Sequence, residues 1–241
     1  MKSALVFGGR SPIALELCNQ LVANNYHVHL ATRIKDDSIV KLATENGCAE
    51  LHECDFENLE DSIALANKID NESGGLNAVA FLQRFRGQAP EPFKQYAIEV
   101  NTPFQIIFNL ARRSRTNQCT IVLATSPAAD RIVDDQDFQY HASKAAITQL
   151  VRYCAVNFAS SNIRTNGVNP GTFVYKSRAA SYYAEHPEFF ELIKKIVPIG
   201  RITTCEEIAC TAMFLLGQQS SNINGQIINI DGGLSSRNLT I

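Results

Sequence analysis

A tyrosine and a lysine four residues apart are the side chains in this sequence best placed to do acid–base chemistry together. They are Tyr140 and Lys144, in the segment Tyr-His-Ala-Ser-Lys, and Ser126 precedes the tyrosine by fourteen residues. Residues spaced i and i+4 share one face of a helix, so the phenol and the ammonium can meet over one reacting group. A tyrosine hydroxyl normally loses its proton near pH ~10, and a neighbouring cation favours the phenolate, which brings proton transfer nearer neutrality. The same spacing also occurs by chance on exposed helices. Whether this pair is catalytic must therefore be judged from the surrounding elements.

A glycine turn near the N-terminus is predicted to bind phosphate. The apolar strand of residues 4–7 leads into Gly8-Gly9, and a helix can begin at Pro12 because proline is favoured at the first helical position. The serine before it is a favoured N-cap, so backbone N–H groups and the helix dipole would point at a pyrophosphate. Pro12 and Ala14 replace later glycines of such turns, which predicts an altered site rather than a lost one. The candidate residues are Gly8, Arg10, Ser11 and Ile13.

The end of the second predicted strand favours NADP over NAD as the cofactor. It carries Thr32 and Arg33 where NAD sites place an acidic residue that binds the ribose 2′-hydroxyl. Arg33 would instead meet a 2′-phosphate, and Arg10 is a second candidate cation because guanidinium groups pair well with phosphate. Each arginine is otherwise a solvated loop charge, and NAD(H) remains the alternative cofactor. After the third strand, Asp55 and Phe56 are expected near the adenine, although Asp is also a common helix N-cap.

Composition and charge narrow the class of protein. The 241 residues are 45% hydrophobic with a formal net charge of −2, which predicts one α/β core and a small-molecule partner rather than nucleic acid. The first strand is too short for a signal peptide and no apolar run approaches the ~20 residues of a membrane span, so we expect a cytoplasmic protein. Seven cysteines without a CxxC pair disfavour a disulfide framework and a structural zinc site. Five dispersed histidines without a His-x-x-x-His pair predict no metal site.

Short apolar segments alternate with longer segments of helical period, the pattern of repeated βαβ units. We therefore expect an α/β fold, with a doubly wound parallel seven-stranded sheet and helices on both faces, in a single domain over residues 1–241. Ligands of such folds collect at the carboxyl ends of the strands. Residues 172–199, rich in aromatic and charged side chains, are expected to form a substrate lid within the domain. The predicted strands lie near residues 3–7, 27–32, 50–53, 76–82, 118–124, 163–168 and 225–230.

Further motifs make the chain resemble the short-chain dehydrogenase/reductase family over nearly its full length, in the single-domain branch that includes 3-oxoacyl-carrier-protein reductases. The motifs are the glycine turn, Asp55, Asn101, Ser126, Tyr140-x-x-x-Lys144, Arg164-Thr165-Asn166, Asn169-Pro170-Gly171, Pro198-Ile199-Gly200-Arg201, Glu206-Glu207-Ile208-Ala209, Phe214-Leu215-Leu216, Asn224-Gly225-Gln226 and Asp231-Gly232-Gly233. The resemblance implies a single-domain Rossmann fold.

The resemblance also implies a role for each motif residue. Tyr140 would be the general acid that protonates a carbonyl oxygen, and Ser126 would position that oxygen, with Thr125 as a substitute for the serine. Lys144 would bind the nicotinamide ribose and favour ionisation of the tyrosine, and Asn101 would hold a water in the proton path. The residues implied around the nicotinamide are Pro170, Gly171 and Phe173.

The chain departs from the family pattern at two places. Phe81-Leu82-Gln83-Arg84 replaces the Asn-Asn-Ala-Gly motif, and either Arg84 or Arg86 is expected to compensate in holding the adenine ribose. The altered glycine turn is similar to that of the enoyl reductase branch, but that branch spaces its tyrosine and lysine more widely.

The leading hypothesis is an NADP(H)-dependent oxidoreductase that reduces a ketone to a secondary alcohol by hydride transfer, with Tyr140 as general acid. Two alternatives remain open: an NAD-dependent alcohol dehydrogenase in the oxidative direction, and a non-catalytic dinucleotide-binding scaffold or sensor. The resemblance implies a homotetramer or homodimer, through the helices of residues 92–113 and 138–159 and the last strand. Several aromatic residues could bind an apolar or ring-bearing ligand, or could instead pack the lid. These residues are Phe85, Phe173, Tyr175, Tyr182, Tyr183, Phe189 and Phe190.

Overall fold

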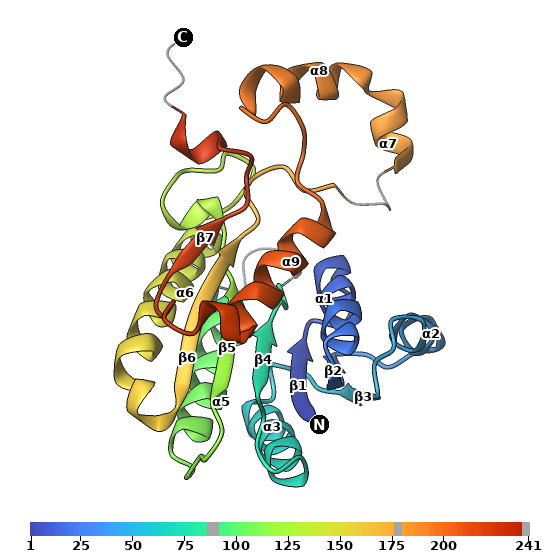
Figure 1. The fold of residues 1–241 in the computed structure, drawn as a ribbon. Helices are drawn as coiled ribbons and strands as arrows, with labels where there is room; N and C mark the ends of the chain where they lie inside the picture. Colours follow the sequence, from blue (N-terminus) through green and yellow to red (C-terminus); the bar gives the residue numbers. More distant parts are fainter. Residues whose placement is uncertain (86–91, 176–179, 238–241) are drawn as a thin grey trace.

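The core of the computed structural model is one parallel sheet, and the structure describes residues 1–85, 92–175 and 180–237 (Figure 1). Among these residues the sheet has seven strands in the order β3-β2-β1-β4-β5-β6-β7, and every neighbouring pair is parallel. The strands are β1 (Lys2–Phe7), β2 (Tyr26–Thr32), β3 (Glu50–Glu53), β4 (Ala78–Phe81), β5 (Cys119–Ala124), β6 (Ile163–Asn169) and β7 (Ile227–Asn229).

Helices cover both faces of this sheet, as the doubly wound prediction requires. One apolar cluster joins the sheet to α1, α2 and α9, and a second joins the opposite face to α3, α5 and α6. The central strands are buried on both faces and are therefore continuous apolar runs. The helices are α1 (Pro12–Ala23), α2 (Asp37–Glu45), α3 (Leu59–Glu72), α4 (Pro92–Tyr96), α5 (Thr102–Ala111), α6 (Phe138–Asn157), α7 (Ala180–Glu185), α8 (Pro187–Ile196) and α9 (Cys205–Leu216).

The direction of winding reverses between β1 and β4. The chain proceeds outward from β1 through β2 to β3, then returns to place β4 on the other side of β1. In open parallel sheets a crevice forms at this switch point, beyond the carboxyl ends of the strands, and ligands bind there. The loops after β1, β2, β4, β5 and β6 therefore define where a functional site should lie.

The segment expected to be a lid contains α7 and α8 within its described part. Figure 1 shows both helices beyond the carboxyl ends of the strands, apart from the main layers. A small separate apolar cluster, centred on Ile193, Val197 and Ile202, holds this segment together.

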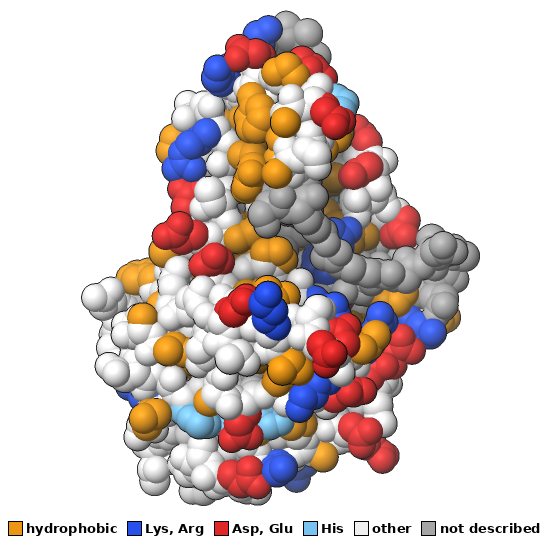
Figure 2. Space-filling model, turned by 90° about the vertical axis from the view of Figure 1, so that its right-hand side faces the viewer, with side chains coloured by type: hydrophobic (Ala, Val, Ile, Leu, Met, Phe, Trp, Pro, Cys, Tyr) orange, Lys and Arg blue, Asp and Glu red, His pale blue; other side chains and the backbone are white. Residues whose placement is uncertain are grey.

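The cysteines and the charged side chains are distributed as follows. All seven cysteines are free, and four of them are buried: Cys18, Cys54, Cys119 and Cys154. Burial raises the pKa of the Cys119 and Cys154 thiols to about 12. On the face drawn in Figure 2, basic and acidic side chains are interspersed rather than gathered by sign. Within the described residues, no helix is long and apolar enough to cross a membrane.

Candidate functional site

The helix α6 presents the predicted acid and its cation. Asp137 is the N-cap, and its carboxylate accepts a hydrogen bond from the Tyr140 N–H at 2.8 Å, so the helix begins just before the tyrosine. Tyr140 and Lys144 therefore occupy the first two turns of α6 on one face. The Lys144 ammonium lies 5.4 Å from the centroid of the Tyr140 ring. The pair predicted from i, i+4 spacing is brought together.

The loop after β5 supplies the serine. The Tyr140 hydroxyl donates a hydrogen bond to Ser126 Oγ at 3.2 Å. Ser126 begins a short 3₁₀ turn and its Oγ also accepts from the Ala128 N–H. Thr125, the substitute considered from the sequence, turns the other way and donates to the carbonyl of Val168 in β6 at 3.1 Å. Ser126 is therefore the hydroxyl that meets the tyrosine.

A buried carboxylate that the sequence analysis missed pairs with Lys144. Glu99 Oε2 lies 2.7 Å from Lys144 Nζ, with side-chain exposures of 1% and 4%. The other oxygen, Oε1, accepts a hydrogen bond from the Phe85 N–H at 2.9 Å. Glu99 lies in a π-helical turn, Ala97–Asn101, whose last residue is the predicted Asn101. Glu99 could have been suspected on physical grounds, because a buried lysine requires a partner of opposite charge. Glu99 is the acidic residue nearest in sequence to Asn101.

The replaced motif after β4 contributes a second cation. The Arg84 guanidinium lies 4.6 Å from the centroid of the Tyr140 ring and donates to Gln136 Oε1 at 2.7 Å. The sequence analysis assigned Arg84 or Arg86 to the adenine ribose. The structure instead places Arg84 against the tyrosine, where a cation interacts favourably with the ring face. Arg86 lies outside the described residues.

The glycine turn after β1 is shaped by the same replaced motif. Gly8 has φ +98°, and a Cβ there would lie 2.7 Å from the backbone of both Leu82 and Gln83. Only glycine fits this close crossing. Within the turn, the N–H groups of Gly8 and Gly9 both donate to the carbonyl of Ala31, at 3.1 and 3.0 Å. The end of β2 is thereby tied to the turn.

The start of α1 fits an anionic ligand. Ser11 is the N-cap and Pro12 the first helical residue, as predicted, but no side chain caps this helix. Side chains cap α2, α3, α6 and α9, whereas α5 and α8, like α1, have no side-chain cap. The first-turn N–H groups of α1, which include that of Ile13, therefore keep their donors for a ligand, and the helix dipole favours a phosphate there. The residues present thus fit the pyrophosphate of a dinucleotide.

The adenosine end differs from the sequence analysis in one respect. Arg33 is exposed and Thr32 is buried at the end of β2, but Arg10 forms an ion pair with Asp36. An acidic residue therefore does reach this region, from the N-cap of α2 rather than from the position after the strand. Hydrogen bonds from Ser38, from a backbone N–H and from Arg10 lower the pKa of Asp36 to about 2.

The loop after β3 places the two predicted adenine contacts differently. Asp55 is exposed, and its Oδ1 accepts from the Glu57 N–H at 3.0 Å. Asn58, not Asp55, is the N-cap of α3, so the helix-cap reading of Asp55 is wrong. Phe56 is buried, and its ring centroid lies 4.7 Å from that of Phe7.

The loop after β6 holds the residues predicted around the nicotinamide. Pro170 and Gly171 are half-buried, and Asn169 Oδ1 accepts from the Gly171 N–H at 3.1 Å. Gly171 has φ +74°, and a Cβ there would lie 2.6 Å from the Asp231 side chain. Phe173 follows as part of the lid cluster, with its ring 6.0 Å from that of Phe189.

Comparison with known proteins matches this geometry to one family. The model of the family described as enoyl-(acyl carrier protein) reductase matches residues 8–235. L-xylulose reductase from Bos taurus is 27% identical over 96% of each chain. The rhamnolipid-biosynthesis 3-oxoacyl-[acyl-carrier-protein] reductase of Pseudomonas aeruginosa is 33% identical, but that match covers 54% of this chain and 50% of the relative. Several other relatives are matched over less than half of their own length.

Solved structures agree with the fold. The complex of Pseudomonas aeruginosa RhlG with NADP superposes with a TM-score of 0.81 at 25% identity, covering 97% of this chain and 96% of that one. An actinorhodin polyketide ketoreductase with NADPH gives a TM-score of 0.82 at 22% identity, over 98% of each chain. The chain belongs to the short-chain dehydrogenase/reductase family, whose members are oxidoreductases that bind a nicotinamide dinucleotide.

Proposed function

We propose that this protein is an NADP(H)-dependent reductase that converts a ketone to a secondary alcohol, with Tyr140 as general acid. The observation that carries the proposal is the 3.2 Å contact of the Tyr140 hydroxyl with Ser126, beside the buried Lys144 ammonium. Two hydroxyl groups at this separation can both donate to one carbonyl oxygen and stabilise the charge that develops on it.

The proposed mechanism assigns a role to each of five side chains. When bound, the cofactor supplies the hydride. Tyr140 would give its hydroxyl proton to the carbonyl oxygen while Ser126 holds that oxygen in place. Lys144 would bind the nicotinamide ribose hydroxyls and keep a positive charge near the tyrosine, and Asn101 would hold the water that returns a proton. Glu99 would hold the Lys144 ammonium in position.

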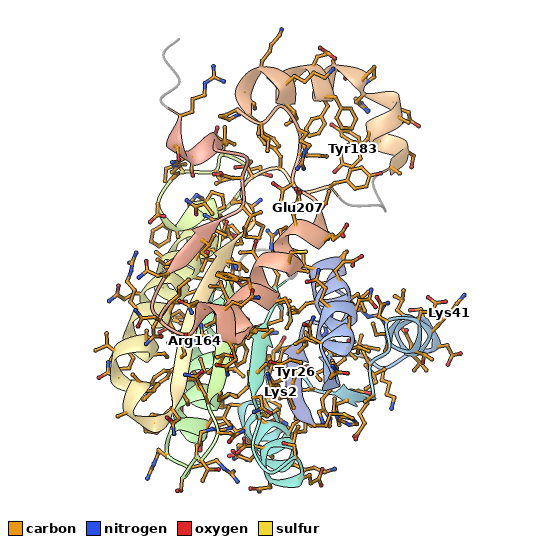
Figure 3. All side chains as sticks on the ribbon, in the orientation of Figure 1. Lys2, Tyr26, Lys41, Arg164, Tyr183 and Glu207 are labelled. Carbon is orange, nitrogen blue, oxygen red and sulfur yellow. The ribbon has the colours of Figure 1, made fainter. Side chains whose placement is uncertain are left out.

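The preference for NADP(H) is proposed to depend mainly on Arg33. Arg10, the other candidate, is already paired with Asp36, whereas Arg33 is exposed at the carboxyl end of β2. Arg33→Ala should weaken NADPH binding about tenfold to a hundredfold, since a charge-assisted hydrogen bond contributes ~1.5–3 kcal/mol, and leave NADH binding unchanged. Lys41→Ala is the matched control, because it also removes one positive charge but lies on the outer side of α2 (Figure 3). Equal loss of NADPH and NADH affinity in Arg33→Ala would contradict the assignment.

Residues 172–199 are proposed as the substrate lid, with an apolar or ring-bearing ketone as the substrate. Figure 3 shows Tyr183 within this segment, above Glu207 near the start of α9. The Tyr183 ring lies 5.1 Å from that of Tyr175 and 5.6 Å from that of Phe189, so much of the aromatic surface packs the lid itself. Tyr182 is half-exposed and offers the remaining ring surface to a ligand.

The proposed oligomer, a homotetramer or homodimer, is supported by exposed apolar side chains on α6. Val156 is 79% exposed and Phe138 is 77% exposed, although both lie on a long helix otherwise buried on one face. Light scattering should give a mass of two or four chains, and a monomer at all concentrations would refute this part of the proposal.

The decisive experiment replaces the proposed acid. Tyr140→Phe should lower kcat for ketone reduction by about 10²–10⁴-fold, the usual contribution of a general acid, while NADPH binding followed by fluorescence is retained. Tyr153→Phe, on the same helix and half-exposed, is the matched control and should keep wild-type turnover. Near-wild-type turnover in Tyr140→Phe would refute the mechanism. Preferred NAD-linked oxidation of alcohols would favour the dehydrogenase alternative, and cofactor binding without turnover of any ketone would favour a scaffold.

A further inference from the structure

Four potential metal ligands lie together at the edge of the sheet formed by β2 and β3, and none of them is among the residues assigned to the dinucleotide site. His27 and His29 are two residues apart on β2, and Glu50 and His52 are two residues apart on β3. The parallel register pairs His29 with Glu50 and, two residues further along, Ala31 with His52. Because side chains alternate across a strand and register partners share a face, all four point to the same side of the sheet.

The donor atoms of His27, His29 and Glu50 are close enough to share one ion, and His52 lies beside two of them. Glu50 Oε1 lies 3.5 Å from His27 Nε2, and Glu50 Oε2 lies 3.9 Å from His29 Nδ1 and 3.7 Å from His52 Nε2. His29 Nδ1 and His52 Nε2 are 3.1 Å apart. Ligands bound tetrahedrally to zinc at ~2.0–2.1 Å are about 3.3–3.4 Å from one another, so these separations need little adjustment. One atom each of His27, His29 and Glu50 lies within 4.8 Å of the others.

The surroundings suit a site that is fixed at its base and open at its mouth. The His29 side chain is only 7% exposed and that of His52 16%, whereas His27 and Glu50 are 42% and 53% exposed. The buried imidazoles are therefore held by packing while the outer ligands give an ion access from solvent. Figure 2 shows histidine side chains reaching the surface near acidic ones low on this face.

We propose that His27, His29, Glu50 and His52 form a binding site for a divalent transition-metal ion of the Zn²⁺ type. Imidazole and carboxylate ligands in a tetrahedral arrangement suit Zn²⁺, and the absence of a thiolate among these four makes the site unlike a Cu(I) or iron–sulfur centre. A bound ion would link the edge strand β3 to β2. Strand β2 ends at Thr32, and Cys54 directly follows β3. Metal occupancy would thus stabilise the edge that borders the adenosine site.

The histidine spacing explains why the sequence analysis predicted no metal site. That prediction relied on the absence of His-x-x-x-His, the spacing that joins two ligands on a helix. On a strand the corresponding spacing is two, and His27-x-His29 with Glu50-x-His52 satisfies it on both neighbours.

The test is a zinc titration of the full chain, stripped with chelator and carrying no histidine tag. Isothermal titration should give one Zn²⁺ per chain, and thermal unfolding should shift upward with Zn²⁺. Glu50→Gln and His52→Gln should each weaken Zn²⁺ affinity roughly tenfold or more. His186→Gln, which removes a histidine from the lid segment, is the matched control and should bind as the wild type does.

A second measurement separates this site from the cysteines, since Cys18 and Cys48 are neighbours. Co²⁺ in place of Zn²⁺ should show visible bands of a tetrahedral nitrogen–oxygen site without the near-ultraviolet thiolate charge-transfer band. Circular dichroism of each metal-free variant establishes that it is folded. The proposal is overturned by no binding to the folded wild type, by unchanged affinity in both Glu50→Gln and His52→Gln, or by a thiolate band. None of these readouts depends on reductase activity.

Discussion

The buried pair of Glu99 and Lys144 should make a large and coupled contribution to stability. At the observed 2.7 Å separation, an effective dielectric constant of about 20 gives an attraction of about 6 kcal/mol, which the desolvation of both charges offsets. Removing one partner leaves the other charge buried without compensation, at a cost of about 3–5 kcal/mol. We therefore expect Glu99→Gln and Lys144→Met each to lower the free energy of unfolding by roughly 3 kcal/mol.

The double variant distinguishes an ion pair from two independent packing defects. With both charges removed, no unpaired charge stays buried, so the loss should be smaller than the sum of the single losses by at least about 1 kcal/mol. Urea unfolding followed by circular dichroism, without cofactor and at one protein concentration, measures all four proteins of the cycle. Losses that add to within about 0.5 kcal/mol would refute the coupling.

The chain offers a control at the same distance. Glu191 and Lys194 are also 2.7 Å apart, but their side chains are 64% and 61% exposed. Because solvent screens such a pair, Glu191→Gln should change the free energy of unfolding far less than Glu99→Gln does. A loss equal to that of Glu99→Gln would mean that distance rather than burial sets the energy.

Three other predictions test separate parts of the structure. Gly8→Ala should lower the free energy of unfolding by at least about 1–2 kcal/mol, because a side chain is strained at φ +98° and collides with the backbone after β4; an unchanged urea midpoint would contradict this. Arg201 holds the pKa of Glu207 at about 2, below its unfolded value, so the stabilisation should be present above pH ~4.5 and disappear as the pH falls towards 2. The stability gap between wild type and Glu207→Gln should narrow over that range, and a constant gap would refute it. Cys119 should resist a thiol reagent at pH 8 until the protein unfolds, while the exposed Cys210 reacts in the folded state; peptide mass spectrometry would reveal the reverse order.

The central strands were predictable because burial on both faces leaves an apolar run, as in Cys119–Ala124, which was predicted at residues 118–124. Strand Tyr26–Thr32, predicted at residues 27–32, instead alternates His27 and His29 with apolar residues. The last strand is shorter than predicted, Ile227–Asn229 within 225–230, since its edge position leaves it half-buried and weakly patterned. The architecture could thus be predicted from the local spacing of apolar residues.

The candidate site was predictable only where its geometry is local. Tyr140 and Lys144 lie on one helix, so their spacing alone indicated a shared face. Glu99 pairs with Lys144 across 45 positions, and Arg84 reaches Tyr140 across 56, so no periodic pattern could reveal either contact. These contacts depend on how the π-helical turn and the loop after β4 pack in three dimensions.

The reversal of strand order also determines when β1 can complete its strand pairing during synthesis. Strand β1 pairs with β4, in a register that joins Ala4 to Ala78, so it cannot complete its place in the sheet until β4 has been made. At ~5–20 residues per second, the ribosome delivers that partner about 4–15 s after β1. For this interval the apolar strand β1 has an open edge, which exposes the nascent chain to non-native strand pairing.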